Sequence, residues 1–112
     1  MKNILLIFAD QMHKYALSAE SPFVRTPNLD RLCREGTRFS SAYSNNPVCT
    51  PFRGVMLSGQ LSSFSGVKNN NDPLPTNVPM LADAFNEAGY ETCFVGKWHL
   101  GESDYYPDKQ GF

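Results

Sequence analysis

The sequence predicts an α/β fold. Two observations carry this prediction: an unbroken apolar run at residues 3–9, and stretches of helical spacing that end at a glycine, at residues 26–36 and 79–89. Segments typical of strands and helices follow one another in the order strand, helix, strand, helix, helix, strand. Neither a repeat nor a linker interrupts residues 1–112, so we expect them to belong to one domain.

Residues 3–9 predict a central parallel strand, because the run has no charged side chain and is rich in isoleucine and leucine. The apolar stretch also resembles the core of a signal peptide. It is too short for one, however, and no small-residue cleavage site follows Asp10. As written, the chain is therefore expected in the cytoplasm, with a removed export signal as the alternative. No run approaches the roughly 18 apolar residues that span a bilayer.

The first helix is predicted from its end signals. Thr26 is a suitable N-cap and Pro27 a suitable first helical residue, and Gly36 is expected to end the helix in the left-handed conformation. Its apolar side chains have the i, i+3, i+4 spacing of one helix face: Leu29, Leu32 and Cys33.

Two further helices are predicted downstream. The pattern of residues 51–57 is helical and ends near Gly59, which places Cys49 at the helix N-terminus. Residues 79–88 predict another helix, which Gly89 stops. One face of that helix carries its apolar residues: Leu81, Ala84, Phe85 and Ala88.

The remaining segments predict two strands and a loop. Residues 37–43 and 90–95 have strand-like patterns, whereas residues 61–76 are rich in Ser, Asn, Pro and Gly and predict an exposed loop.

Charge and cysteine content exclude several classes of function. With 10 basic and 11 acidic side chains, the chain has a net charge of -1, which gives no attraction for nucleic acid or for an anionic membrane. Three cysteines without CxxC spacing indicate neither a disulfide framework nor a structural zinc site.

Asp10 and Gln11 form the first candidate cluster. They follow the predicted strand at residues 3–9, and open α/β sheets bind ligands at the carboxyl ends of their strands. A carboxylate and an amide oxygen are suitable ligands for Ca²⁺ or Mg²⁺. The alternative is that Asp10 only caps a turn.

Cys49 and Arg53 form the second cluster. A helix N-terminus favours an anion or a thiolate at Cys49, and Arg53 follows one turn later on the same side. The alternative for a lone cysteine is a buried, inert thiol.

Lys97 and His99 form the third cluster. Residues two apart share a face of an extended segment, so both side chains would point to one side of Trp98. The alternative is a surface lysine and a histidine bound to a backbone carbonyl. Together the three clusters suit an anionic substrate with a tetrahedral centre.

The clusters carry a resemblance to a known family. Residues 49–53, Cys-Thr-Pro-Phe-Arg, with residues 56–59 behind them, resemble the C-x-P-x-R signature of type I sulfatases, in which the cysteine becomes formylglycine. Residues 4–11 resemble the first strand and metal pair of that family, and residues 88–101 its second motif. The resemblance implies an alkaline-phosphatase-like, mostly parallel sheet flanked by helices, with residues 1–112 as the N-terminal portion of the catalytic domain.

The resemblance also implies an activity, the hydrolysis of sulfate monoesters. Asp10 and Gln11 would bind Ca²⁺, with Mg²⁺ as the alternative, together with the modified Cys49. A hydroxyl of the hydrated aldehyde would attack sulfur. Lys97 would neutralise charge on the sulfate, Arg53 would orient the diol, and His99 would hydrogen-bond or deprotonate it.

Two positions depart from the family pattern. Gln11 stands where a second aspartate is common, and Phe52 where a small residue is usual. The partners implied are a small-molecule or carbohydrate sulfate ester and the formylglycine-generating enzyme.

The chain ends in loop-like sequence, and family members are longer, so further site residues are expected beyond Phe112. As an isolated fragment it is expected to be inactive and to self-associate through exposed sheet surface. Two other functions stay open: hydrolysis of phosphonate or phosphate esters by the same superfamily, and a non-catalytic fragment or assembly module.

Overall fold

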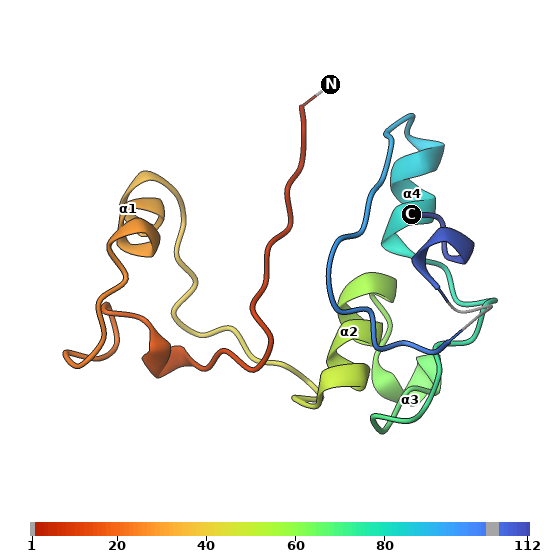
Figure 1. Ribbon diagram of the computed structural model, residues 1–112, viewed down its shortest axis with the longest axis horizontal. Coiled ribbons are helices and arrows are strands. Elements are labelled where there is room, and N and C mark those ends of the chain that lie inside the picture. Colours follow the sequence, from red (N-terminus) through yellow and green to blue (C-terminus); the bar gives the residue numbers. More distant parts are fainter. Residues whose placement is uncertain (1, 103–105) are drawn as a thin grey trace. The chain divides into compact units, whose positions relative to one another are not determined.

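The computed structural model describes residues 2–102 and 106–112. They form two compact units, Met1–Ala42 and Tyr43–Phe112, each of which is considered by itself. That both belong to one domain stays a prediction. The described helices are α1 (Pro27–Glu35), α2 (Cys49–Ser58), α3 (Ser62–Ser65) and α4 (Leu81–Glu87), with 3₁₀ turns η1 (Lys14–Ala16) and η3 (Pro107–Lys109) (Figure 1).

The predicted sheet is not confirmed, because none of the described residues is in a strand. Residues 3–9 run as an extended trace (Figure 1), and residues 37–43 and 90–95 are irregular. A strand exists only where a second backbone segment accepts and donates its hydrogen bonds. Without such a partner, Leu5 is 82% exposed and Ile7 79% exposed.

In the first unit, α1 begins as predicted, with Thr26 as N-cap and Pro27 as first residue. The Thr26 hydroxyl does not cap the helix; it accepts a hydrogen bond from the Ser18 N–H at 3.0 Å. Gly36 ends the helix as predicted, but its expected left-handed conformation is wrong, since its φ is -127°. Its N–H donates to the Leu32 carbonyl at 2.9 Å, and this bond closes the last turn of α1.

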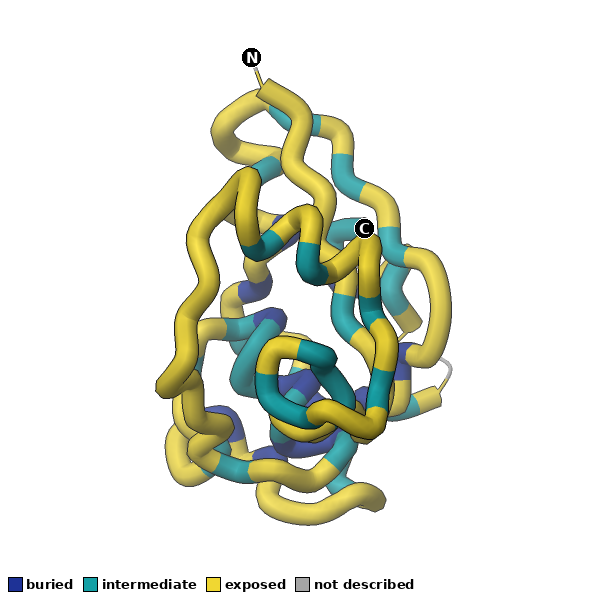
Figure 2. The backbone as a smooth tube through the Cα atoms, turned by 90° about the vertical axis from the view of Figure 1, so that its left-hand side faces the viewer, coloured by how far each residue is buried: buried dark blue, intermediate teal, exposed yellow. Residues whose placement is uncertain are grey.

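In the second unit, the core lies around α2. Its buried apolar residues come from α2, from α4 and from the irregular segments between and after them: Leu57, Val67, Leu74, Met80, Ala82, Trp98 and Leu100. Figure 2 shows in dark blue where buried positions lie along the backbone. No helix of the described residues is both long enough and apolar enough to cross a membrane.

The prediction of an exposed loop at residues 61–76 is wrong in part. The segment contains α3, and its Val67 and Leu74 are fully buried. Val67 packs over Gly54 of α2, where a Cβ would lie at an ordinary contact distance of 3.5 Å from the Val67 Cβ. The Leu74 N–H donates to the Leu100 carbonyl at 2.9 Å. Two well-spaced apolar residues thus hold a polar segment to the core.

The α4 helix ends as predicted at Gly89, which has a φ of +81°. The Gly89 N–H donates to the Asn86 carbonyl at 2.9 Å, and the Tyr90 N–H to the Phe85 carbonyl at 3.0 Å. With the Phe85 and Tyr90 rings 5.3 Å apart, this is a Schellman motif with its apolar contact. The buried residue of α4 is Ala82, which lies outside the apolar face noted in the sequence.

Candidate active site

Cys49 is the first residue of α2, which confirms its predicted place at a helix N-terminus. Its side chain is half-buried. The N-cap residue, Val48, provides no side-chain hydrogen bond. Instead, the Thr50 N–H donates to Asn70 Oδ1 at 3.1 Å, and the Thr50 hydroxyl donates to the Asn70 carbonyl at 2.9 Å. A distant loop therefore holds the start of the helix.

Arg53 lies one turn after Cys49 and is only 4% exposed. Its Nη1 donates a hydrogen bond to the main-chain carbonyl of Lys97. This bond joins α2 to the segment that carries Lys97 and His99. The bond thus links two of the three sequence clusters, and the buried Arg53 places a cation on the helix that begins with Cys49.

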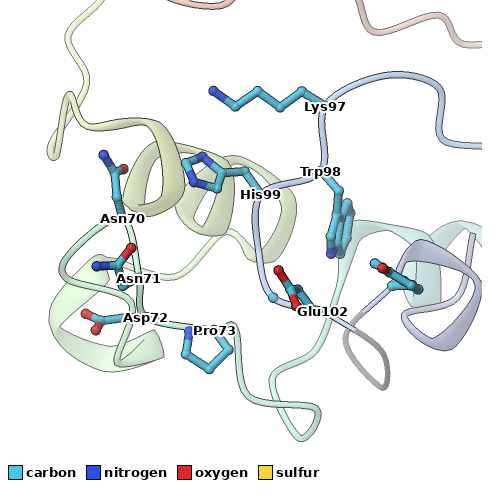
Figure 3. A pocket seen from close by; sticks show the side chains of 10 residues that line it. Asn70, Asn71, Asp72, Pro73, Lys97, Trp98, His99 and Glu102 are labelled. Atoms are coloured by element: carbon cyan, nitrogen blue, oxygen red, sulfur yellow. The ribbon is translucent and has the colours of Figure 1, made fainter.

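Trp98 points away from Lys97 and His99 (Figure 3), as the sequence predicts, but the backbone of the segment is not extended as expected. Trp98 is 8% exposed and packs edge-on against Phe94, with ring centroids 5.0 Å apart. His99 is not in an extended strand: its φ is +58°, in the left-handed region. Figure 3 shows Lys97 and His99 on one side of the segment, with Trp98 directed away from them.

The left-handed backbone at His99 costs about 1 to 2 kcal/mol for a residue with a Cβ. It persists because the residues on both sides, Trp98 and Leu100, are buried. Such strain is found where the surrounding structure fixes a side chain in one place. His99 is thus an exposed imidazole on a fixed backbone.

A cleft of about 720 Å³ opens beside this segment (Figure 3). Its lining combines the second motif with a polar loop: Asn70, Asn71, Asp72, Pro73, Lys97, Trp98, His99, Gly101, Glu102 and Tyr106. The described residues of the lining include one lysine and two carboxylates. Among the described residues, Cys49 and Arg53 are not part of its lining, although both belong to the helix that Asn70 holds.

Asp72 shapes the loop that lines this cleft. Its Oδ2 accepts hydrogen bonds from the N–H groups of Lys68, at 2.9 Å, and Asn69, at 2.8 Å. These bonds hold the pKa of Asp72 below its usual value, with the Lys68 N–H as the larger cause. Sequence reasoning missed Asn70 and Asp72. The signal was the run Asn-Asn-Asn-Asp at residues 69–72, since Asn and Asp bond the backbone of their own turns.

Asp10 and Gln11 lie in an exposed turn of the first unit. Gln11 has a φ of +57°, so a left-handed residue follows the carboxylate. Their oxygens fit part of a Ca²⁺ or Mg²⁺ ligand set. Within residues 2–102 and 106–112, no three His, Cys, Asp or Glu side chains lie close enough to hold a metal. A metal shared by Asp10, Gln11 and Cys49 stays a prediction.

Comparison with known proteins decides the family. Residues 2–112 match the sulfatase family. The chain belongs to the sulfatase family. This sulfatase chain is similar to an uncharacterised sulfatase of Escherichia coli, YidJ, with 43% identity over 74% of the chain and 17% of the relative.

Two further relatives cover nearly the whole chain. The ulvan-active sulfatase of Formosa agariphila is 40% identical over 98% of the chain and 23% of its own length. The N-acetylgalactosamine-6-sulfatase of Canis lupus familiaris is 38% identical over 98% of the chain and 24% of its own length. The sulfatase chain thus spans about a quarter or less of each relative. Its family implies an α/β fold, of which the described residues show the helices.

Proposed function

We propose that the protein containing this chain is a sulfuric ester hydrolase that uses modified Cys49 as its nucleophile. The observation that carries the proposal is the joining of two sequence clusters in one unit. Cys49 begins α2, and Arg53 of α2 bonds the main chain of Lys97. Sulfatase family membership and sulfatase relatives support the same activity.

The formylglycine derived from Cys49 would supply a nucleophilic hydroxyl, and a divalent metal, which we propose to be Ca²⁺, would polarise sulfate oxygens. Asp10 and Gln11 would hold the metal through a carboxylate and an amide oxygen. Arg53 would orient and charge-balance the group at position 49. Its bond to Lys97 engages one of the five N–H donors of the guanidinium and fixes the direction of its plane.

Lys97 and His99 would act from the cleft. The ammonium of Lys97, a residue of the cleft lining, would attract the anionic sulfate and offset its charge. His99 would donate or accept the proton exchanged with the group at position 49, and its fixed backbone suits that role.

A carbohydrate sulfate is the substrate class that the cleft favours. The amide side chain of Asn71 can donate and accept hydrogen bonds, and the carboxylates of Asp72 and Glu102 can accept them, which suits the hydroxyl groups of a sugar ring. One relative is named for an N-acetylgalactosamine sulfate. We also propose that residues 3–9 form a strand of a mostly parallel sheet in the complete protein, which would place Asp10 and Gln11 at its carboxyl edge.

The test is turnover of a sulfate ester by the full-length protein and by Cys49→Ala. We expect the variant to lose at least about 10³-fold in kcat, as when a covalent nucleophile is removed. Cys93→Ala is the matched control, since Cys93 is an exposed thiol of the same unit. Retained turnover in Cys49→Ala would overturn the proposal, and turnover by neither protein would favour the non-catalytic alternative.

A phosphate monoester of the same alcohol should react more slowly than the sulfate ester. The described lining of the cleft has the carboxylates of Asp72 and Glu102 as well as the ammonium of Lys97, and a phosphate dianion carries more charge than a sulfate monoanion. Faster turnover of the phosphate ester would favour the phosphohydrolase alternative.

A further inference from the structure

We propose that Asn70 is a positioning residue for Cys49: it holds the first turn of α2 in place against the cleft that contains Lys97 and His99. The inference rests on the proposed function, because it concerns the same nucleophile. Asn70 lies far along the chain from Cys49 and is joined to the helix through Thr50, the residue that follows Cys49.

The first turn of a helix has backbone N–H groups without partners in the helix, and in α2 Asn70 accepts from one of them. The Thr50 N–H donates to Asn70 Oδ1 at 3.1 Å. Pro51 has no N–H to offer. The Phe52 N–H donates to the Val48 carbonyl at 2.9 Å. Asn70 therefore supplies the capping acceptor that the apolar side chain of the N-cap residue, Val48, cannot provide.

The two hydrogen bonds between Thr50 and Asn70 restrict the orientation of the helix start as well as its distance from the loop. The side chain of Asn70 accepts from the main chain of Thr50, and the main chain of Asn70 accepts from the side chain of Thr50 at 2.9 Å. Because Thr50 is only 1% exposed, water does not compete strongly for these bonds. The pair limits both translation and rotation of the helix start, and so sets the direction of the adjacent Cys49 side chain.

The loop that presents Asn70 is itself held. Asp72 Oδ2 accepts hydrogen bonds from the N–H groups of Lys68, at 2.9 Å, and Asn69, at 2.8 Å, which closes a tight turn. On either side of this turn, Val67 and Leu74 are fully buried. A fixed loop can transmit its position to the helix, whereas a loose one could not.

Asn70 also belongs to the wall of the cleft. It lines the same space as Lys97 and His99, and Figure 3 shows the His99 imidazole directed toward it. One residue thus touches both the helix that carries the nucleophile and the cleft that would receive the sulfate. A displacement of about 1 Å between reacting groups can cost about 10²-fold in rate.

The experiment measures kcat and KM for a single sulfate ester with the full-length protein. The variants are Asn70→Ala, Asn70→Asp, which keeps an acceptor oxygen, and the matched control Asn77→Ala, which alters an exposed asparagine. Each kcat is divided by the fraction of formylglycine at position 49, determined by peptide mass, so that incomplete maturation does not imitate a loss of rate.

We expect Asn70→Ala to lower kcat by about 10- to 100-fold with KM changed by less than about 3-fold. Asn70→Asp should recover most of the loss, and Asn77→Ala should match the wild type. A rise in KM with kcat unchanged would make Asn70 a substrate contact. A lower urea midpoint with kcat unchanged would make it a stabilising cap. Either result overturns the inference.

Thr50→Val is the second variant, in case Asn70→Ala does not fold. It removes the hydroxyl bond to the Asn70 carbonyl while keeping the shape of the side chain, and Thr50→Ser keeps the bond. Thr50→Val must lower kcat and Thr50→Ser must restore it. Cys49→Ala in the same assay separates the two proposals. If it stays active, the proposed function fails; if it is inactive while Asn70→Ala and Thr50→Val are fully active, only this inference fails.

Discussion

Trp98 is buried against Phe94 and Phe112, while the residues on either side of it, Lys97 and His99, are exposed at the cleft. In this short segment Trp98 therefore contributes to the core, whereas Lys97 and His99 are available to a bound substrate. Lys97 and His99 lie on one side of the segment (Figure 3), although His99 has a left-handed φ of +58° in place of the expected extended backbone.

Lys97→Ala and His99→Ala should each lower kcat by about 10²- to 10³-fold and leave the urea midpoint nearly unchanged, since both side chains are exposed. Trp98→Ala should lower the free energy of unfolding by about 3 to 5 kcal/mol, because it empties a buried site. Turnover and urea unfolding of the three variants test this. A His99→Ala variant with full activity and a low urea midpoint would assign His99 to structure alone.

The stability of the second unit should depend on Asp72 at acid pH. Its folded-state pKa is lowered, so the stabilisation is complete above the ordinary value of 3.8 and is lost as the pH falls below it, through the folded pKa. Asp72→Asn removes the titrating group and should flatten this part of the profile. Urea midpoints between about pH 2 and 6 test it. Identical profiles for both proteins would contradict the account.

At the scale of the element, α2 has two glycines whose backbone conformations differ: Gly54 inside the helix and Gly59 at its C-cap. Gly54 lies inside the helix, and a Cβ there would make ordinary contacts with Val67 at 3.5 to 3.6 Å. Gly59 ends the helix with a φ of +69°, and nothing lies within 4 Å of the position that a Cβ would take there. Space is therefore adequate at both positions, and only the backbone differs.

Gly54→Ala should raise the free energy of unfolding by about 0.5 to 1 kcal/mol, the helix preference of alanine over glycine. Gly59→Ala should lower it by about 1 kcal/mol or more, because alanine is strained in the left-handed region. The two variants are controls for each other in urea unfolding. Equal effects would show that the end of α2 does not depend on the conformation of Gly59.

The helices were predictable because their signals are local. Proline at the start of α1 and glycine after α2 and α4 determine the ends from a few neighbouring residues. The burial of Val67 and Leu74 was not predictable, because Val67 packs against α2 at Gly54 and Leu74 bonds the Leu100 carbonyl, and neither partner is a near neighbour in the sequence. Asn70 was missed for the same reason: its partner, Thr50, is twenty positions away.

At the scale of the whole molecule, the apolar run at residues 3–9 is largely exposed in the described structure. Ile4, Leu5 and Ile7 are all more than half exposed in the described structure. Pairing in a parallel sheet is non-local, so these residues carry the pattern of a strand without determining its neighbours. The same holds for Asp10 and Gln11, whose role depends on the edge to which that strand belongs.

In the full-length protein, the backbone amides of Ile4 to Phe8 should exchange hydrogen as slowly as those of α2, because a central strand has both faces covered and its N–H groups bonded. Phe23, which is 93% exposed, marks a reference segment that should exchange rapidly. Amide exchange followed by mass spectrometry tests this. Rapid exchange at both segments would contradict the assignment of residues 3–9 to the sheet.

The most direct test of the account is the mass of the peptide that contains Cys49 in catalytically active, full-length protein. The helix start at Cys49, the bond from Arg53 to Lys97 and the sulfatase family all lead to one chemical change at this residue. We predict a peptide lighter by the difference between a CH₂SH and a CHO side chain, or the hydrate of that aldehyde. An unmodified thiol throughout active protein would contradict the central claim.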